Sequence, residues 1–408
     1  MSGLEHDVVL LDVLDVLDPA FRPDSEQVAQ ARAAGWYART TVGFVVLRYP
    51  QAAEVLADRR FVLPGAASLI ARGVSSGPMY DWWTSIIVNV DGAAHARLRR
   101  LVGKAFTRRA VDALRGVMRA VAEELVDTFA ATGECEFMAD FADPYPVRII
   151  CELLGVPNDQ QALQGWVDDL GLMFGPAVAE HRDRIEASLA ALYHTVDDLI
   201  ERRRARPGHG LLSDLISVEE SGDRLSAQEL RLLVSTMLFA SQDTTRHQLG
   251  LAMTTFLAHP DQWRLLAEQP ELATQAVEEV LRTAPVIPLS GRVAAEACTL
   301  HGLHIPAGAR IHILINAANT DPAVFGQTTF DITATRPAPQ LTFGGGSSHH
   351  CLGAFLARTE LAEALPILAR GLCDPRLAGT PQWRPPVGVT GPVTLPLRFT
   401  PTRQPFET

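Results

Sequence analysis

Apolar side chains recur with helical spacing along most of the chain. Over Thr107–Ala131 they fall at every third or fourth position, which places them on one face of a helix. Ser226–His259 is the longest such stretch, because Ser226 and Glu229 form a capping box at its start and Pro260 ends it. At a rise of 1.5 Å per residue this helix would span roughly 50 Å, enough to cross the whole molecule. Further helices are expected over residues 50–58, 144–154, 158–174, 180–204, 260–268, 270–283 and 354–372.

Strand-like patterns are short and gather towards the two ends of the chain. Trp36–Arg39 and Phe44–Tyr49 are rich in β-formers around a short turn, which predicts a hairpin. Residues 292–315 alternate between short strands and turns, and a late strand is expected near 393–399. Residues 62–90 contain Gly and Ser, so we expect a loop there, and its Trp and Ile side chains suggest that it covers a pocket. No repeat of fixed period is found, so we expect one large, mainly helical domain with small β-sheets over residues 1–408.

Composition narrows the class of protein. With 36 Lys and Arg against 47 Asp and Glu the net charge is −11, which argues against a nucleic acid partner. The five cysteines are scattered and contain no CxxC pair, a pattern typical of a reducing compartment. The N-terminus has no basic segment, and acidic residues interrupt the apolar stretch that follows. It resembles neither a signal peptide nor a membrane anchor, so we expect a cytoplasmic protein without membrane contact.

A glycine-rich loop, Phe343 to Gly353, delivers Cys351 to the start of the helix expected over 354–372. Consecutive glycines suit a tight loop that approaches something closely. A cysteine at a helix N-terminus faces unpaired N–H groups, which stabilise its thiolate. On this evidence Cys351 is a nucleophile, a metal ligand or an inert buried cysteine. Zinc is disfavoured because neighbouring His349, His350 and Cys351 do not coordinate one metal well, and a cysteine hydrolase would need a paired base.

Polar residues interrupt the longest helix at Ala240–Thr245. Asp243 and Thr244 follow an apolar run. Burying such polar side chains costs free energy unless they are hydrogen-bonded. Small Ala240 and Ser241 leave room for a ligand against the backbone. The alternative is a solvated patch on a surface helix.

Two further spacings are weak by themselves. Glu279 and Arg282 stand three apart on one helical face and can pair. His95 and Arg99 also share a face, within a segment whose basic run, Arg97–Arg109, contrasts with the acidic chain. That run indicates either a local anionic partner or simply a solvated helix face.

Taken in order, these motifs resemble the cytochrome P-450 family of heme-thiolate monooxygenases, in its soluble bacterial form, over essentially the whole chain. The resemblance implies a mainly α fold with small β-sheets and heme b held between the long central helix and the Cys351 loop. Cys351 would be the axial ligand of the iron, and a thiolate there favours O–O cleavage. His95, Arg99, Arg292 and His349 would bind the heme propionates.

The resemblance also implies roles for other residues. Asp243 and Thr244 match the acid–alcohol pair that delivers protons to bound dioxygen. Glu279 and Arg282, completed by Arg336, would form a structural cluster behind the heme. By position, the substrate contacts are expected at Trp82, Trp83, Ile86, Phe174, Met237, Ala240, Ile287, Leu289 and Thr390, which are mostly apolar.

This sequence departs from the family pattern in two places. Phe343 and Cys351 are eight steps apart where seven are usual, so one residue is extra, at Ser347 or Ser348. Ser241 stands where glycine is common, and we expect its hydroxyl to bond back to its own helix.

The expected function is therefore that of a monomeric, heme-dependent monooxygenase of secondary metabolism. It would insert one atom of O2 into an apolar small molecule, by hydroxylation or epoxidation. Electrons would come from NAD(P)H through a separate ferredoxin and its reductase, with Arg97–Arg109 as the docking surface. The alternatives are a peroxygenase driven by hydrogen peroxide and a non-catalytic heme sensor, and the pair Asp243 and Thr244 argues against both.

Overall fold

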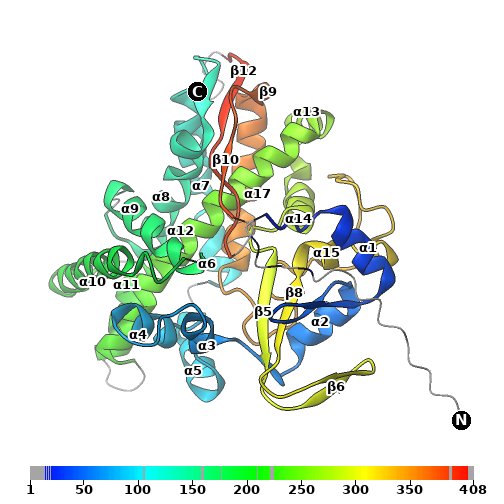
Figure 1. Ribbon diagram of the computed structural model, residues 1–408. Coiled ribbons are helices and arrows are strands. Elements are labelled where there is room, and N and C mark those ends of the chain that lie inside the picture. Colours follow the sequence, from blue (N-terminus) through cyan, green and yellow to red (C-terminus); the bar gives the residue numbers. More distant parts are fainter. Residues whose placement is uncertain are drawn as a thin grey trace, which may run out of the picture.

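The central helix α12, Ala227–Ala258, passes through the middle of the molecule (Figure 1). The computed structural model describes residues 14, 16, 18, 20–103, 106–157, 160–175, 177–208, 210–220, 225–385 and 388–402. Ser226 accepts a hydrogen bond from the Glu229 amide, and the Glu229 carboxylate accepts one from the Ser226 amide. The predicted capping box and the length of this helix are thus confirmed.

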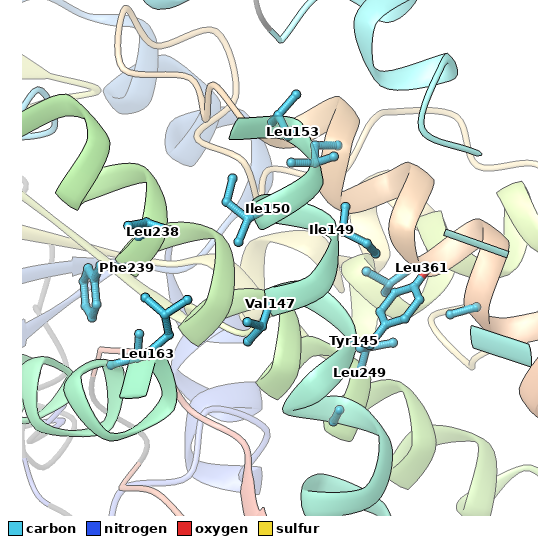
Figure 2. Packing of buried hydrophobic residues seen from close by; sticks show 14 of the residues in the cluster. Tyr145, Val147, Ile149, Ile150, Leu153, Leu163, Leu238, Phe239, Leu249 and Leu361 are labelled. Atoms are coloured by element: carbon cyan, nitrogen blue, oxygen red, sulfur yellow. The ribbon is translucent and has the colours of Figure 1, made fainter. Parts of the chain in front are cut away.

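Helices pack around α12 on several sides. They are α8 (Pro144–Leu154), α9 (Gln160–Gly171), α10 (Arg182–Ala205), α11 (Leu211–Glu220), α13 (Pro260–Glu268), α14 (Ala273–Thr283) and α17 (Ala354–Gly371). Helix α7 (Arg115–Asp127) packs against α17 and α8. Figure 2 shows Tyr145 of α8 beside Leu249 of α12 and Leu361 of α17, all fully buried. Side chains of this size stabilise the fold by about 1.5–3 kcal/mol each when buried, so this three-helix contact fixes α12 against α17.

The largest sheet in the described part of the chain has five strands. Its order is β1-β2-β8-β5-β3, and the predicted hairpin of β1 and β2 is confirmed. β2 pairs in parallel with β8, which pairs antiparallel with β5. Its strands are β1 (Tyr37–Thr40), β2 (Gly43–Val46), β3 (Phe61–Val62), β5 (Leu289–Ala294) and β8 (Arg310–Leu314).

The remaining strands of the described residues form small sheets. A hairpin joins β6 (Cys298–Leu300) to β7 (Leu303–Ile305), and a three-stranded sheet has the order β4-β12-β9. These last strands are β4 (Glu134–Glu136), β9 (Cys373–Leu377) and β12 (Pro396–Thr400). The C-terminal hairpin pairs β10 (Gln382–Trp383) with β11 (Pro392–Thr394) and runs beside α12, since Gly391 lies against His247.

Shorter helical elements connect these parts. They are α1 (Glu26–Ala34), α2 (Tyr49–Ala57), α5 (Gly92–Val102), α15 (Ile315–Asn319), α16 (Pro322–Phe325), the π-helical η1 (Met138–Ala142) and the 3₁₀ turns η2 (Leu172–Phe174) and η3 (Pro270–Leu272). None of the helices in the described ranges is long and apolar enough to span a bilayer.

Two sequence predictions were wrong in detail. The expected loop over 62–90 contains the helices α3 (Gly65–Ile70) and α4 (Pro78–Ser85), the second started by Pro78 in its first turn. The single helix expected over Thr107–Ala131 is broken into α6 (Arg108–Asp112) and α7. Apolar periodicity continues across that break, so the pattern alone could not show it.

Candidate active site

The loop that carries Cys351 is closed by backbone hydrogen bonds. The Cys351 amide donates to the Phe343 carbonyl at 2.9 Å, which joins the two ends of the loop. Gly345 has a φ of 54°, and a Cβ there would lie 3.2 Å from Leu341 and 3.3 Å from Leu56. Glycine is therefore required both by the backbone and by the space.

Ser347 closes two tight turns in this loop. The Ser347 amide donates to the Gly344 carbonyl at 3.1 Å, and the Ser347 carbonyl accepts from the His350 amide at 3.0 Å. The Ser347 hydroxyl also accepts a hydrogen bond from the His349 amide at 3.0 Å. These hydrogen bonds fix the backbone between Gly344 and His350, directly before Cys351.

Cys351 is exposed to solvent-sized molecules, but many protein atoms lie near its sulfur. Desolvation raises the pKa of its thiol, whereas the Gly353 N–H and the positive charges of Arg99 and Arg358 act in the opposite direction. The Arg99 guanidinium also donates to the carbonyl of His350, directly before the cysteine. These donors stabilise negative charge on the sulfur, as a thiolate ligand of a metal requires.

Basic side chains gather next to this loop, and burial lowers the pKa of His95 below its usual value. The rings of His95 and His349 stack with centroids 4.0 Å apart, and His349 Nε2 lies 2.6 Å from the Asp91 carboxylate. Arg292 is 5% exposed, and burial lowers its pKa to about 10 while Asp91 opposes that shift. An accessible thiol together with His95, Arg99, Arg292 and His349 fits an iron porphyrin that carries two carboxylates.

The polar segment Ala240–Thr245 of α12 contains the exposed residue Ala240 and the buried residue Asp243. Ala240 is exposed in the middle of the helix, and Asp243 is 1% exposed. The Ser241 hydroxyl donates to the Met237 carbonyl at 2.7 Å, as predicted, and the Thr244 hydroxyl donates to the Ala240 carbonyl at 2.8 Å. Small and polar residues thus leave one face of α12 open around Ala240.

Two arginines hold the carboxylate of Asp243. Arg384 Nη1 lies 2.8 and 2.9 Å from its two oxygens, and Arg246 Nη2 lies 3.0 Å from Oδ1. Burial acts to raise the pKa of Asp243, but the two guanidinium groups outweigh it and lower the pKa. Sequence reasoning missed Arg384, because it comes from the C-terminal hairpin and no local pattern marks it.

The model of the cytochrome P-450 family matches residues 35–368. This chain belongs to the cytochrome P-450 family. It is 40% identical to the luteothin monooxygenase of Streptomyces thioluteus over 95% of this chain and 96% of that protein. It is 38% identical to the mycinamicin IV hydroxylase/epoxidase of Micromonospora griseorubida, over 87% and 89% of the two chains. Among solved structures, CalO2 superposes with a TM-score of 0.84 at 31% identity, over 94% of this chain and 99% of that one.

Family membership makes this protein a heme-dependent P-450 monooxygenase, an oxidoreductase that uses an organic substrate, O2 and a redox partner. Glu279 of this P-450 lies in α14 and is 3% exposed. Arg282 donates to its two oxygens at 2.8 and 2.7 Å, and Arg336 Nε donates at 3.1 Å. Burial acts to raise the pKa of Glu279, but these arginines outweigh it and lower the pKa. The predicted partners Glu279, Arg282 and Arg336 therefore lie together.

The structure brings only some of the predicted substrate contacts together. Phe174 meets Trp83 edge to face at 5.6 Å and stacks on Phe239 at 6.1 Å. Trp82 contacts Phe239 as well, at 5.8 Å, so Phe239 is a member of this aromatic group that sequence reasoning missed. Ala240 and Ile287 are exposed, Thr390 is partly exposed, and Trp82, Ile86 and Met237 are buried in the main core.

Leu289 does not belong to this group. It packs against the N-terminal cluster around Leu14, Val45 and Leu314. Since side chains alternate along the regularly paired strand β5, Leu289 points to the face opposite Arg292.

Glu360 is a further buried carboxyl group, and sequence reasoning missed it. It lies in α17 at 1% exposure and accepts a hydrogen bond from the Thr245 hydroxyl at 3.3 Å. Its Oε1 has no partner among the described residues. Burial raises its pKa to about 8, so the group is neutral at physiological pH. An acidic residue among the apolar positions of the helix after Cys351 was the available signal.

Proposed function

We propose that this P-450 inserts one atom of O2 into an apolar small molecule of secondary metabolism, by hydroxylation or epoxidation. The chain would act as a monomer with a single domain over residues 1–408 and heme b as its cofactor. The observation that carries the proposal is the pair of Asp243 and Thr244 in α12, because a peroxygenase or a heme sensor has no need of proton delivery.

Cys351 would hold the iron as its axial ligand, with His95, Arg99, Arg292 and His349 binding the propionates. When bound, the heme supplies the iron at which dioxygen is reduced and activated. Glu279, Arg282 and Arg336 would have a structural role behind it.

Thr244 and Asp243 would have different parts in moving protons. The Thr244 hydroxyl hydrogen is engaged by the Ala240 carbonyl, so the hydroxyl oxygen is left to accept a hydrogen bond, for example from water. Asp243 is held as a carboxylate by Arg384 and Arg246, and it would exchange a proton with ordered water.

The substrate would lie against apolar side chains. The aromatic group of Trp82, Trp83, Phe174 and Phe239, with exposed Ile287, favours an apolar molecule over a charged one. For the reason given above, Leu289 is not included in this proposal.

The redox partner would be a ferredoxin that docks on the cysteine side of the molecule. Arg100, Arg108 and Arg109 are exposed, and the Arg108 guanidinium lies 4.8 Å from the ring of Phe355, four residues after Cys351. Arg97 pairs instead with Glu229 at the start of α12, and Lys104 lies outside the described residues. The docking surface is thus narrower than the whole Arg97–Arg109 run.

Charge reversal tests this docking surface. Arg100→Glu with Arg108→Glu should slow reduction by ferredoxin at low salt by tenfold or more, and high salt should shrink the difference. Arg202→Glu, on the exposed end of α10, is the control and should have little effect. Equal rates for the double variant and the parent would refute the proposed surface.

The proposed reaction is tested with NADPH, a ferredoxin and its reductase, and isotopically labelled O2. Addition of a substrate should speed NADPH oxidation and place one labelled oxygen atom in the product. Asp243→Asn and Thr244→Ala should each lower the product formed per NADPH by about tenfold or more, because proton delivery is worth 10²–10⁴-fold in enzymes generally. Turnover supported by hydrogen peroxide alone would indicate the peroxygenase, and no turnover with any electron source would indicate the sensor.

A further inference from the structure

Asp243 lies in a cluster of charged side chains that come from distant parts of the chain. Arg384 Nη1 lies 2.8 and 2.9 Å from its two oxygens, and Arg246 Nη2 lies 3.0 Å from Oδ1. His247 Nδ1 is 3.6 Å from Oδ1, but burial lowers the pKa of His247 to about 3, so its ring is neutral. Two guanidinium groups therefore balance a carboxylate that is 1% exposed.

The two arginines are not equivalent. Arg246 stands three residues from Asp243 on α12 and also pairs with Asp143 and Asp168. Its charge is thus shared among three carboxylates, and its place on the same helix is fixed. Arg384 reaches Asp243 from the hairpin β10–β11, so the position of the hairpin decides whether Asp243 keeps its second cation.

The Arg384 guanidinium also fills the space at the end of α9. A Cβ at Gly171 would lie 2.9 Å from Arg384 Nη2, and Asp168, one turn earlier, has its Oδ1 4.0 Å from the same nitrogen. Any side chain at position 171 would therefore force the Arg384 guanidinium to move. One side chain of the hairpin therefore bridges α9 and α12.

The hairpin goes on to contact the aromatic group of the substrate site. A Cβ at Gly388 would lie 2.5 Å from the Cβ of Phe174, and one at Gly391 would lie 2.8 Å from the Cβ of His247. Phe174 in turn stacks on Phe239 of α12. Phe174 therefore contacts both α12 and the loop between β10 and β11.

We propose that Arg384 is a positioning residue for Asp243, and that the hairpin β10–β11 transmits occupancy of the substrate pocket to this carboxylate through Phe174. This rests on the proposed role of Asp243 in proton delivery. In a coupled turnover, NADPH, one proton, O2 and the substrate give oxygenated product, water and NADP⁺. When proton delivery is faulty, NADPH, one proton and O2 give hydrogen peroxide and NADP⁺ instead, and the substrate is unchanged.

Removal of Arg384 changes the charge around Asp243 in a definite direction. The charged or titratable groups that face it are Arg246 and His247 from α12, Asp168 from α9, Asp143 before α8, and Arg384. Arg384→Gln leaves one guanidinium beside Asp243, Asp168 and Asp143, and burial raises the pKa of Asp143 itself to about 6. Loss of the Arg384 charge therefore raises the pKa of Asp243. We expect severalfold more hydrogen peroxide per NADPH, and an acid limb of the coupling profile that moves to higher pH. Arg384→Lys restores the charge and should bring back the pH profile, with partial recovery of coupling.

A pair of glycines on α9 supplies a matched test. Gly171→Ala places a methyl group against Arg384 Nη2, whereas Gly165→Ala, on the same helix, meets nothing within 4 Å. Hydrogen exchange in the resting holoprotein reads this out without turnover. Peptides from α9 and β10 should exchange faster in Gly171→Ala and Arg384→Gln, and at the parent rate in Gly165→Ala. Phenylimidazole, as a probe that ligates heme iron and fills an apolar pocket, should change β10 exchange in the parent and in Arg384→Gln alike, because the contact between Phe174 and Gly388 does not involve Arg384. Unchanged β10 exchange in the parent would refute transmission through Phe174.

The outcomes separate this inference from the proposed function. The inference is overturned if Arg384→Gln keeps the parent's pH profile and peroxide share, or if the two alanine variants exchange alike. A parent protein that forms no product with any electron source refutes the proposed function instead. The exchange comparison still decides whether the hairpin is coupled to α9.

Discussion

The buried carboxyl group of Glu360 makes the stability of this P-450 depend on pH, and Glu360→Gln exposes that dependence. Glutamine keeps the shape of the side chain and its acceptor for the Thr245 hydroxyl, but it cannot ionise. The pKa of Glu360 is raised by burial from 4.5 to about 8 in the folded protein. The folded protein therefore holds this proton more tightly than the unfolded chain does.

The magnitude follows from linkage between proton binding and folding. A raised pKa gives a stability contribution that is fully present below pH 4.5 and is lost as the pH rises towards 8. Each unit of pKa difference is worth about 1.4 kcal/mol, so the parent should lose about 3 kcal/mol of unfolding free energy between about pH 5 and about pH 8 through this group alone. Glu360→Gln should not lose this amount.

Denaturant unfolding, followed by far-ultraviolet circular dichroism across that pH range, measures the effect. The unfolding free energy of Glu360→Gln minus that of the parent should grow steadily as the pH rises. Glu363→Gln on the same helix is the control, since Glu363 pairs with Arg115 and Arg119, and its difference from the parent should not grow in this way. Parallel curves for Glu360→Gln and the parent would refute the reasoning.

Two further pairs of variants follow from the structure. Glu279→Gln leaves buried Arg282 without its carboxylate and should lower the unfolding free energy by about 3–5 kcal/mol, whereas Glu278→Gln, which breaks a more exposed pair, should cost under about 1 kcal/mol in the same denaturant titration. Gly345→Ala should cost about 1–3 kcal/mol and loosen heme retention, because its φ of 54° is strained for alanine; Gly346→Ala, where a Cβ meets only ordinary contact at 3.6 Å, should retain heme as the parent does.

Sequence reasoning succeeded where the chain carries local signals. The capping box of Ser226 and Glu229 marked the start of α12, and the small and polar residues around Asp243 marked its open face. Glycines before Cys351 likewise marked a tight loop, in which Gly345 has a backbone conformation that favours glycine. In each case the physical requirement falls on neighbouring residues, so the sequence displays it.

The features that the sequence did not reveal depend on contacts between residues far apart in the chain. Arg384 reaches Asp243 across 141 positions, and nothing in the C-terminal segment indicates an ion pair. Leu289 has the apolar character of a substrate contact, but the register of β5 turns it to the opposite face of the sheet. Side-chain direction within a sheet is set by pairing with partner strands, which composition does not reveal.

The central claim, that Cys351 ligates heme iron as a thiolate, is tested most directly by the carbon monoxide difference spectrum of the reduced protein. The account predicts the band of thiolate-ligated heme in the parent, its loss in Cys351→Ser, and its retention in Cys373→Ser. A parent protein that binds heme but lacks the thiolate band would contradict the account.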